Sequence, residues 1–280
     1  MHATQRTRLP AFALVGPLLL VVALYRLLWS LASMEETLVS PSLAKDSGAG
    51  ELKLSPALAA QPAARAAIPC ASKDFILSRY ESKRKGISDI HGHMPYLRAL
   101  GNNVSSVLDI GVRFVVSSWA FAAAAVDRAD RGLATRYVGA DLRRLQQVDK
   151  LLDALKNCTA VVNPQFIEGD DLLMAYPRSD LVFIDTWHAY KQLIRELEVL
   201  SPFAERYIVL HDTTSFATTD ERLSGHGGKP VNVSLFAGVQ ANKAGLWTAV
   251  QDFLALDARW VVKQRFTHNN GLTVLERVSV

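Results

Sequence analysis

Residues 180–213, with the sequence DLVFIDTWHAYKQLIRELEVLSPFAERYIVLHDT, contain the clearest secondary-structure pattern of this chain. Two short apolar runs within it, residues 181–184 and 207–210, have the length of strands that are buried on both faces. Between them lies a helical pattern, with charged residues on one side and apolar residues on the other. The apolar residues of this helix are Leu193, Leu197 and Leu200. The order strand, helix, strand predicts a βαβ unit with two parallel strands.

Acidic and imidazole side chains stand at the carboxyl ends of both predicted strands. Asp185 and His188 follow the first strand, and His211 and Asp212 follow the second. The carboxyl ends of parallel strands face the ligand crevice of an open α/β sheet, so we expect these side chains to converge on one site. The alternative is structural, since Asp212 could cap a turn and His188 could be an ordinary residue at a helix start.

The composition of the whole chain is that of a globular protein with a substantial core. Its 280 residues are 49% hydrophobic, which is enough for one large domain with accessory segments. The formal net charge is +4, and the basic residues are scattered along the sequence. Because nucleic-acid binding needs a clustered basic surface, we expect no nucleic-acid partner.

The N-terminal segment is predicted to be a signal anchor. Arg6 and Arg8 precede an apolar stretch, residues 9–32, which is long enough to span a bilayer if Arg26 snorkels toward an interface. The N-terminal basic residues predict a single-pass type II membrane protein whose remainder faces the Golgi or ER lumen. The small residues at 30–33 leave a cleaved signal peptide, and therefore a secreted protein, as the alternative.

Three regions are expected along the chain: a tail and anchor at 1–33, a low-complexity stem at 34–72 and a folded domain at 73–280. The acceptors for N-linked glycans are Asn103, Asn157 and Asn232. These acceptors matter only if the chain enters the secretory pathway. Cys70 and Cys158 could pair there or remain free thiols, and the sequence leaves both possibilities open.

Strands and helices alternate through the folded domain. A charged helical segment, residues 73–100, is predicted to be a lid or an entry helix pair, in which His91 and His93 are ordinary exposed loop histidines. Strands are predicted at 104–110, 136–140, 161–167, 181–184 and 207–210, helices at 119–126, 142–156 and 245–256, and a final hairpin at 259–266 and 271–278. We therefore predict an α/β fold, a Rossmann-like open sheet of about seven strands, mostly parallel with a C-terminal antiparallel hairpin.

This order, with an acidic residue closing each of the first strands, resembles the class I S-adenosylmethionine (SAM)-dependent methyltransferase fold over about residues 73–280. Within that superfamily, the motifs FIDTWHAY and YIVLHDT resemble the cephalosporin hydroxylase-like and sugar O-methyltransferase group. The resemblance implies a divalent metal held by Asp185, His211 and Asp212, and a base or proton shuttle at His188. Carboxylates suit Mg or Mn, the metals that we expect, although the imidazole shifts the preference toward Mn, Fe or Zn.

The part of the sequence expected to bind the cofactor departs from the methyltransferase pattern. The first loop keeps a single glycine, and Val115 and Val116 stand where the related group has a glycine pair. Valine is poor at positive φ, so the turn is expected to take another course or to bind the cofactor differently. The residues expected to bind SAM are Asp109, Gly111, Ser117, Ser118, Asp141, Asp170 and Asp171. Among these, Asp141 would face the ribose hydroxyls, and Asp170 or Asp171 would lie near the adenine.

Together these features predict a SAM-dependent and divalent-metal-dependent O-methyltransferase that acts on a hydroxyl of a saccharide or small polyol. The long polar loop at 214–234 is expected to be a substrate lid. Trp119 and Trp247 could be platforms for a sugar or aromatic ring, but core packing is the commoner role of tryptophan.

Three other functions remain open at this stage. A Golgi-type glycosyltransferase would suit an anchored luminal domain, but it needs an Asp-x-Asp motif and the chain offers only the adjacent pair Asp170-Asp171. An Fe(II) oxygenase would need His188 as a further metal ligand. A degenerate binding module would have lost SAM through its glycine-poor first loop.

Overall fold

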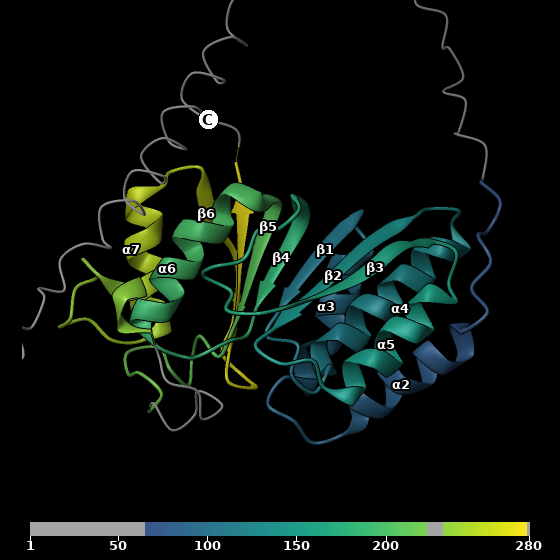
Figure 1. Ribbon diagram of the computed structural model, residues 1–280, viewed down its shortest axis with the longest axis horizontal. Coiled ribbons are helices and arrows are strands. Elements are labelled where there is room, and N and C mark those ends of the chain that lie inside the picture. Colours follow the sequence, from purple (N-terminus) through teal and green to yellow (C-terminus); the bar gives the residue numbers. More distant parts are fainter. Residues whose placement is uncertain (1–64, 223–231, 279–280) are drawn as a thin grey trace, which may run out of the picture. The chain divides into compact units, whose positions relative to one another are not determined.

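The computed structural model describes residues 65–222 and 232–278 of the chain. These residues fold around one seven-stranded sheet (Figure 1). The strand order is β3-β2-β1-β4-β5-β7-β6. Strands β1 to β5 all run parallel to one another. Strand β7 pairs antiparallel with both β5 and β6. This arrangement confirms the predicted fold class for the folded domain, including the antiparallel C-terminal hairpin.

The elements follow the predicted order. The strands are β1 Ser106–Ile110, β2 Thr135–Asp141, β3 Val161–Glu168, β4 Ser179–Ile184, β5 Ala204–His211, β6 Trp260–Phe266 and β7 Leu272–Arg277. The α-helices are α2 Lys73–Lys85, α3 Met94–Gly101, α4 Val116–Asp130, α5 Gln146–Lys156, α6 Tyr190–Leu200 and α7 Leu246–Leu256. The 3-10 helices are η2 His91–His93, η3 Ser201–Phe203 and η5 Val233–Phe236.

The sheet is buried on both faces, as the side chains of β4 illustrate. Leu181 and Phe183 join the core formed with α2, α3, α4 and α5. Val182 and Ile184 join the second core, which contains residues of α6 and α7. Because successive side chains of a strand point to opposite faces, the uninterrupted apolar run of β4 serves both cores.

The tips of β4 and β5 lie side by side. In the register of these parallel strands, Ile184 pairs with Leu210. The residues that follow, Asp185 and His211, therefore emerge at the same carboxyl edge of the sheet.

The turn after β1 requires a glycine because it touches the tip of β4. Gly111 has a φ of +84°, and a Cβ atom built on it would lie 1.9 Å from the carbonyl oxygen of Asp185. The Gly111 N–H donates to the Ala140 carbonyl at 2.9 Å, and the Asp185 N–H donates to the Ile110 carbonyl at 3.0 Å. The one glycine that the sequence retains in this loop is therefore the one that the packing of β1, β2 and β4 demands.

The first loop places a valine in a conformation that valine rarely adopts. Val115 adopts the left-handed conformation, with a φ of +54°, immediately before α4 begins. A β-branched residue pays roughly 1–2 kcal/mol for this conformation. The side chain of Val115 is 1% exposed within the core, and this burial offsets the conformational cost.

A disulfide bond joins Cys70, just before α2, to Cys158, just after α5. Two backbone hydrogen bonds flank it, from the Ala71 N–H to the Asn157 carbonyl and from the Thr159 N–H to the Pro69 carbonyl. Of the two possibilities left open by the sequence, the structure therefore has the paired cysteines. The bridge fastens the start of the helical layer to the main domain.

The predicted membrane location requires correction. No helix among residues 65–222 and 232–278 is long and apolar enough to cross a membrane, and this finding contradicts the single-pass location. The segment expected to form the anchor, residues 9–32, lies outside the described residues, as does most of the predicted stem.

Candidate active site

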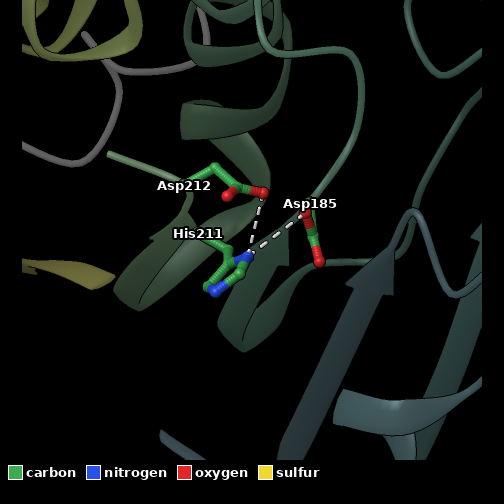
Figure 2. A group of neighbouring side chains, drawn as sticks. All are labelled: Asp185, His211 and Asp212. Atoms are coloured by element: carbon green, nitrogen blue, oxygen red, sulfur yellow. Dashed lines mark hydrogen bonds and ion pairs between the residues drawn. The ribbon is translucent and has the colours of Figure 1, made fainter. Parts of the chain in front are cut away.

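Three side chains from the β4 and β5 tips form one cluster (Figure 2). His211 Nδ1 lies 3.5 Å from Asp185 Oδ1 and 3.1 Å from Asp212 Oδ2. One donor atom from each of the three residues lies within 4.8 Å of the other two. His211 and Asp212 are buried and Asp185 is half-buried, so the cluster is a compact set of two carboxylates and one imidazole.

Consecutive residues can both face this cluster because the chain turns at Asp212. In an extended strand, His211 and Asp212 would point to opposite faces of the sheet. Asp212 instead has a φ of +59°, a left-handed conformation that aspartate tolerates better than most residues. The turn brings its carboxylate back beside the imidazole of His211.

The hairpin between β6 and β7 sets the orientation of His211. The Asn269 carbonyl oxygen lies 3.2 Å from His211 Nε2, within hydrogen-bonding distance. Because a carbonyl can only accept, Nε2 carries the hydrogen of this bond and Nδ1 faces the carboxylates. His93 lies 3.2 Å from the same carbonyl and is buried, so the prediction of an exposed loop histidine was wrong for this residue.

His188 lies beside the cluster. Its Nε2 is 2.8 Å from Asp212 Oδ2 and 3.4 Å from Asp185 Oδ1. The ring stacks on Phe216, with 4.8 Å between centroids and 16° between planes. The four side chains that the sequence predicted to converge are therefore brought together.

The charges of these four groups balance one another. Burial by itself lowers the pKa of His188, but the carboxylates of Asp185 and Asp212 raise it to about 10. Burial likewise opposes protonation of His211, and the same carboxylates raise its pKa to about 11. The pKa of Asp212 is well below its usual value, because hydrogen bonds from both imidazoles outweigh its burial. Without a cation, two imidazolium groups thus neutralise two carboxylates.

The donor set fits a divalent cation. Asp212 Oδ1 is buried and has no hydrogen-bond partner among the described residues. A buried carboxylate oxygen left in this way is costly unless a ligand occupies it. Two carboxylates and one imidazole nitrogen are ligands that Mn, Fe and Zn accept, and the carboxylates also suit Mg.

A cavity of about 360 Å³ opens beside this cluster. Its walls include Asp185, His188 and Asp212 and, from the predicted cofactor residues, Gly111, Ser117, Asp141 and Asp171. Of the first-loop valines, Val115 is buried in the core, whereas Val112 and Val116 form part of the cavity wall without filling it. An acidic residue at the end of β2 is suited to ribose hydroxyls, so the wall at Asp141 fits a nucleoside.

The other predicted cofactor residues do not line the cavity. Asp109 is fully buried and accepts hydrogen bonds from Ser118 Oγ at 2.6 Å and from the Tyr137 hydroxyl at 2.8 Å. Burial raises the pKa of Asp109 to about 6. Asp170 accepts from the Leu172 N–H in a local turn. The hydrogen bond between Asp109 and Ser118 joins β1 to α4.

Solved structures of methyltransferases are similar to this chain. The Podospora anserina methyltransferase PaMTH1, bound to SAH, is 14% identical, with 77% of this chain and 91% of that chain covered and a TM-score of 0.47. The Bacillus cereus O-methyltransferase in complex with SAH is 12% identical, with 74% and 91% covered and a TM-score of 0.46. TomG from Streptomyces achromogenes, an O-methyltransferase involved in tomaymycin synthesis and solved with SAM, is 14% identical, with 76% and 92% covered and a TM-score of 0.42.

Neither a protein-family model nor a curated protein sequence matches the chain. The three solved proteins are methyltransferases, the kind of enzyme that the sequence resembles. Because these identities and TM-scores are low, we take the fold from the strand order and the function from the chemistry of the site.

Three tryptophans have different surroundings in the structure. Trp119 is 1% exposed and belongs to the core, and its ring packs edge-on against the exposed Phe75. Trp247 stacks against the Arg265 guanidinium, 3.7 Å from its ring centroid. Trp187, which follows Asp185 by two residues and was not singled out, is the tryptophan among the cavity-lining residues. Its position in the motif FIDTWHAY, directly after a strand end, was the available signal.

Proposed function

We propose that this chain is a SAM-dependent O-methyltransferase that uses a divalent cation and acts on a hydroxyl of a saccharide or small polyol. One observation carries the proposal: a single cavity is lined both by Asp141, which is suited to a nucleoside, and by the two carboxylates of the cluster, Asp185 and Asp212. Methyl transfer needs the methyl donor and the activated oxygen next to each other, and a shared cavity meets that need.

In this proposal, SAM binds in the part of the cavity at the carboxyl ends of β1 and β2, where it would contact Gly111, Asp141 and Asp171. Asp141 would accept hydrogen bonds from the ribose hydroxyls, as acidic residues at this strand position do in dinucleotide sites. The carboxylate is oriented by the Arg113 N–H, which donates to its Oδ2 at 2.8 Å.

Asp185, His211 and Asp212 would hold the cation. A cation held there would orient two neighbouring hydroxyls of the substrate and lower the pKa of the one that reacts. His188 would then accept the proton of that hydroxyl as the oxygen attacks the methyl group of SAM. The Phe216 ring, stacked on His188, keeps the imidazole in one plane during this step.

The choice of a saccharide or polyol rests on the resemblance of FIDTWHAY and YIVLHDT to the sugar O-methyltransferase group. It is also consistent with a cation site, since neighbouring hydroxyls are bidentate ligands for a hard metal.

Isothermal titration calorimetry of the purified chain with SAM and, separately, with UDP-glucose tests the proposal. We expect saturable binding of SAM and no binding of UDP-glucose. Saturable binding of UDP-glucose alone would contradict the proposal and favour a glycosyltransferase. A methyl-transfer assay on a vicinal diol, with and without EDTA, then measures the metal requirement.

A further inference from the structure

The loop after β5 supplies a carboxylate that the sequence did not single out. Glu221 Oε2 lies 3.0 Å from Nδ1 of His188. The two backbones also meet, because the Glu221 N–H donates to the His188 carbonyl oxygen at 2.7 Å. The His188 N–H in turn lies 3.4 Å from Glu221 Oε2. One residue thus contacts both the backbone and the ring of His188.

The His188 ring lies between two sets of oxygen atoms. Its Nε2 faces Asp212 Oδ2 at 2.8 Å, whereas its Nδ1 faces Glu221. The contact at Nδ1 is electrostatic, since its angle is not that of a hydrogen bond. A carboxylate at this distance still favours the ring orientation that presents an N–H edge to it.

Glu221 is itself held by the scaffold. The preceding residue, Asp220, accepts through Oδ1 from the Tyr190 N–H at 2.8 Å and from the Gly245 N–H at 2.7 Å. These two donors lie at the starts of α6 and α7, so Asp220 fastens the loop to both helices. The Glu221 side chain is 27% exposed, so most of it is shielded from solvent.

We infer that Glu221 is a positioning residue for His188: its carboxylate holds Nδ1 on the loop side and so directs Nε2 at Asp185 and Asp212. The catalytic meaning of this inference rests on the proposed function. With a cation on Asp185 and Asp212 and the ring neutral, a hydrogen kept on Nδ1 would leave the lone pair on Nε2, the nitrogen that faces the cavity. In the proposed methyl-transfer step, the substrate O–H bond would break and its proton would go to that lone pair. The oxygen would use the released electron pair to form a bond to the methyl carbon, while the S–CH3 bond of SAM breaks, its electron pair stays on sulfur and SAH leaves.

A kinetic comparison of Glu221→Ala, Glu221→Gln and the full-length wild type tests the positioning role. We expect Glu221→Ala to lower kcat by about 10–100-fold, the range seen for residues that orient a functional imidazole. The KM for SAM and the Kd for Mn²⁺ should stay unchanged. Glu221→Gln should recover most of kcat, because an amide oxygen can still face Nδ1. Glu198→Gln, an acidic residue on α6 that pairs with Arg195, is the matched control and should behave as wild type.

A second readout does not depend on activity. Long-range ¹H–¹⁵N spectra of the histidine side chains are recorded without SAM or metal, and His188→Asn identifies the His188 signals. We expect the ring nitrogens of His188 to shift in Glu221→Ala and to keep their wild-type positions in Glu198→Gln. This measurement distinguishes the two proposals, since it reports on the ring even if the wild type transfers no methyl group.

Three results would overturn the inference. The first is an unchanged His188 spectrum in Glu221→Ala. The second is a loss confined to the KM for SAM or to Mn²⁺ affinity, which would make Glu221 a binding residue. The third is a Glu221→Gln variant as slow as Glu221→Ala, because an orienting contact would then not explain the loss.

Discussion

Asp185, His211 and Asp212 occupy positions that a strand pattern can predict, since each comes directly at or after the end of a buried parallel strand. What the pattern does not contain is the turn at Asp212, whose positive φ brings two consecutive side chains to one cluster. The geometry of the cluster therefore depends on a single backbone conformation as well as on residue identity.

The first prediction concerns the three proposed ligands. We expect Asp185→Asn to weaken Mn²⁺ binding by at least about 10-fold, the effect reported even for residues that only support a ligand. The substitution is nearly isosteric, so the melting temperature should change little. Calorimetry with Mn²⁺ measures the first effect and thermal unfolding measures the second. Mn²⁺ binding equal to that of wild type would remove Asp185 from the ligand set.

The second prediction concerns Asp109 and pH. Burial raises its pKa to about 6, above the usual 3.8 of an exposed aspartate, despite hydrogen bonds from Ser118 and Tyr137. Because the folded-state pKa is the higher one, this group stabilises the folded chain at low pH, and the contribution is lost as the pH rises through about 6. The folded state has to bury a charge above that pH.

Asp109→Asn removes this dependence. From pH 5 to pH 7.5, the free energy of unfolding of the variant should gain about 1 kcal/mol relative to wild type. Urea denaturation at the two pH values measures the difference, and Asp130→Asn, on the exposed end of α4, serves as the control. A difference between Asp109→Asn and wild type that is independent of pH would contradict the assigned pKa.

Other residues at the site were beyond sequence analysis. Asn269 contributes a backbone carbonyl to His211, and any residue in that turn has such a group. Glu221 lies 33 residues from His188 in a polar loop, so no periodicity connects the two. His93 was judged an exposed histidine because Gly92 suggested a loop, but the 3-10 helix η2 buries it against the hairpin.

At the scale of elements, the site depends on the contact between the β1 turn and the β4 tip. The third prediction tests it with Gly111→Ala. The new methyl group would clash with the Asp185 carbonyl and would also strain a φ of +84°, so the free energy of unfolding should fall by more than about 1 kcal/mol. SAM affinity should fall as well, because the turn must move.

A matched control exists for this variant. Gly238 has a similar φ of +81°, but a Cβ there would meet only Arg195 Nη2, at 3.9 Å. Gly238→Ala should therefore show the conformational cost alone and keep SAM binding. Equal losses for the two variants, measured by urea denaturation, would show that the close approach to β4 is unimportant.

The fourth prediction concerns the disulfide bond between the segment before α2 and the end of α5. It closes a loop across 88 residues of sequence separation, so its removal should lower the free energy of unfolding by about 2–4 kcal/mol. Cys70→Ser/Cys158→Ser and reduced wild type should lose the same amount in urea denaturation. Unchanged stability in both would contradict the bridge.

Which elements could be predicted follows from their burial. Strand β4 and helix α6 have clear apolar periods because they are covered by well-defined neighbours. The start of α4 was predicted too late, at 119, because Ser117 and Ser118 are residues that commonly cap a helix; both lie inside the helix, which begins at Val116. The intrinsic conformational preference of valine disfavours the left-handed conformation, but burial of Val115 in the core outweighs this preference.

At the scale of the whole molecule, alternation of strands and helices predicted the sheet. The pair Asn270-Gly271, which is typical of a tight turn, lies between the two strands of the predicted terminal hairpin. The pairing of Cys70 with Cys158 could not be predicted, because it depends on where two distant segments meet. The membrane location inferred from the N-terminal pattern is contradicted, and the three expected regions of the chain remain a prediction.

The central claim is that a methyl donor and a divalent cation share the cavity at the carboxyl ends of β1, β4 and β5. A crystal structure of the chain with SAH and Mn²⁺, with anomalous scattering to locate the metal, tests it most directly. We predict an anomalous peak among Asp185, His211 and Asp212, and SAH against Gly111 and Asp141. Saturating SAH and Mn²⁺ with no metal peak at the cluster, or a nucleoside bound elsewhere, would contradict the account.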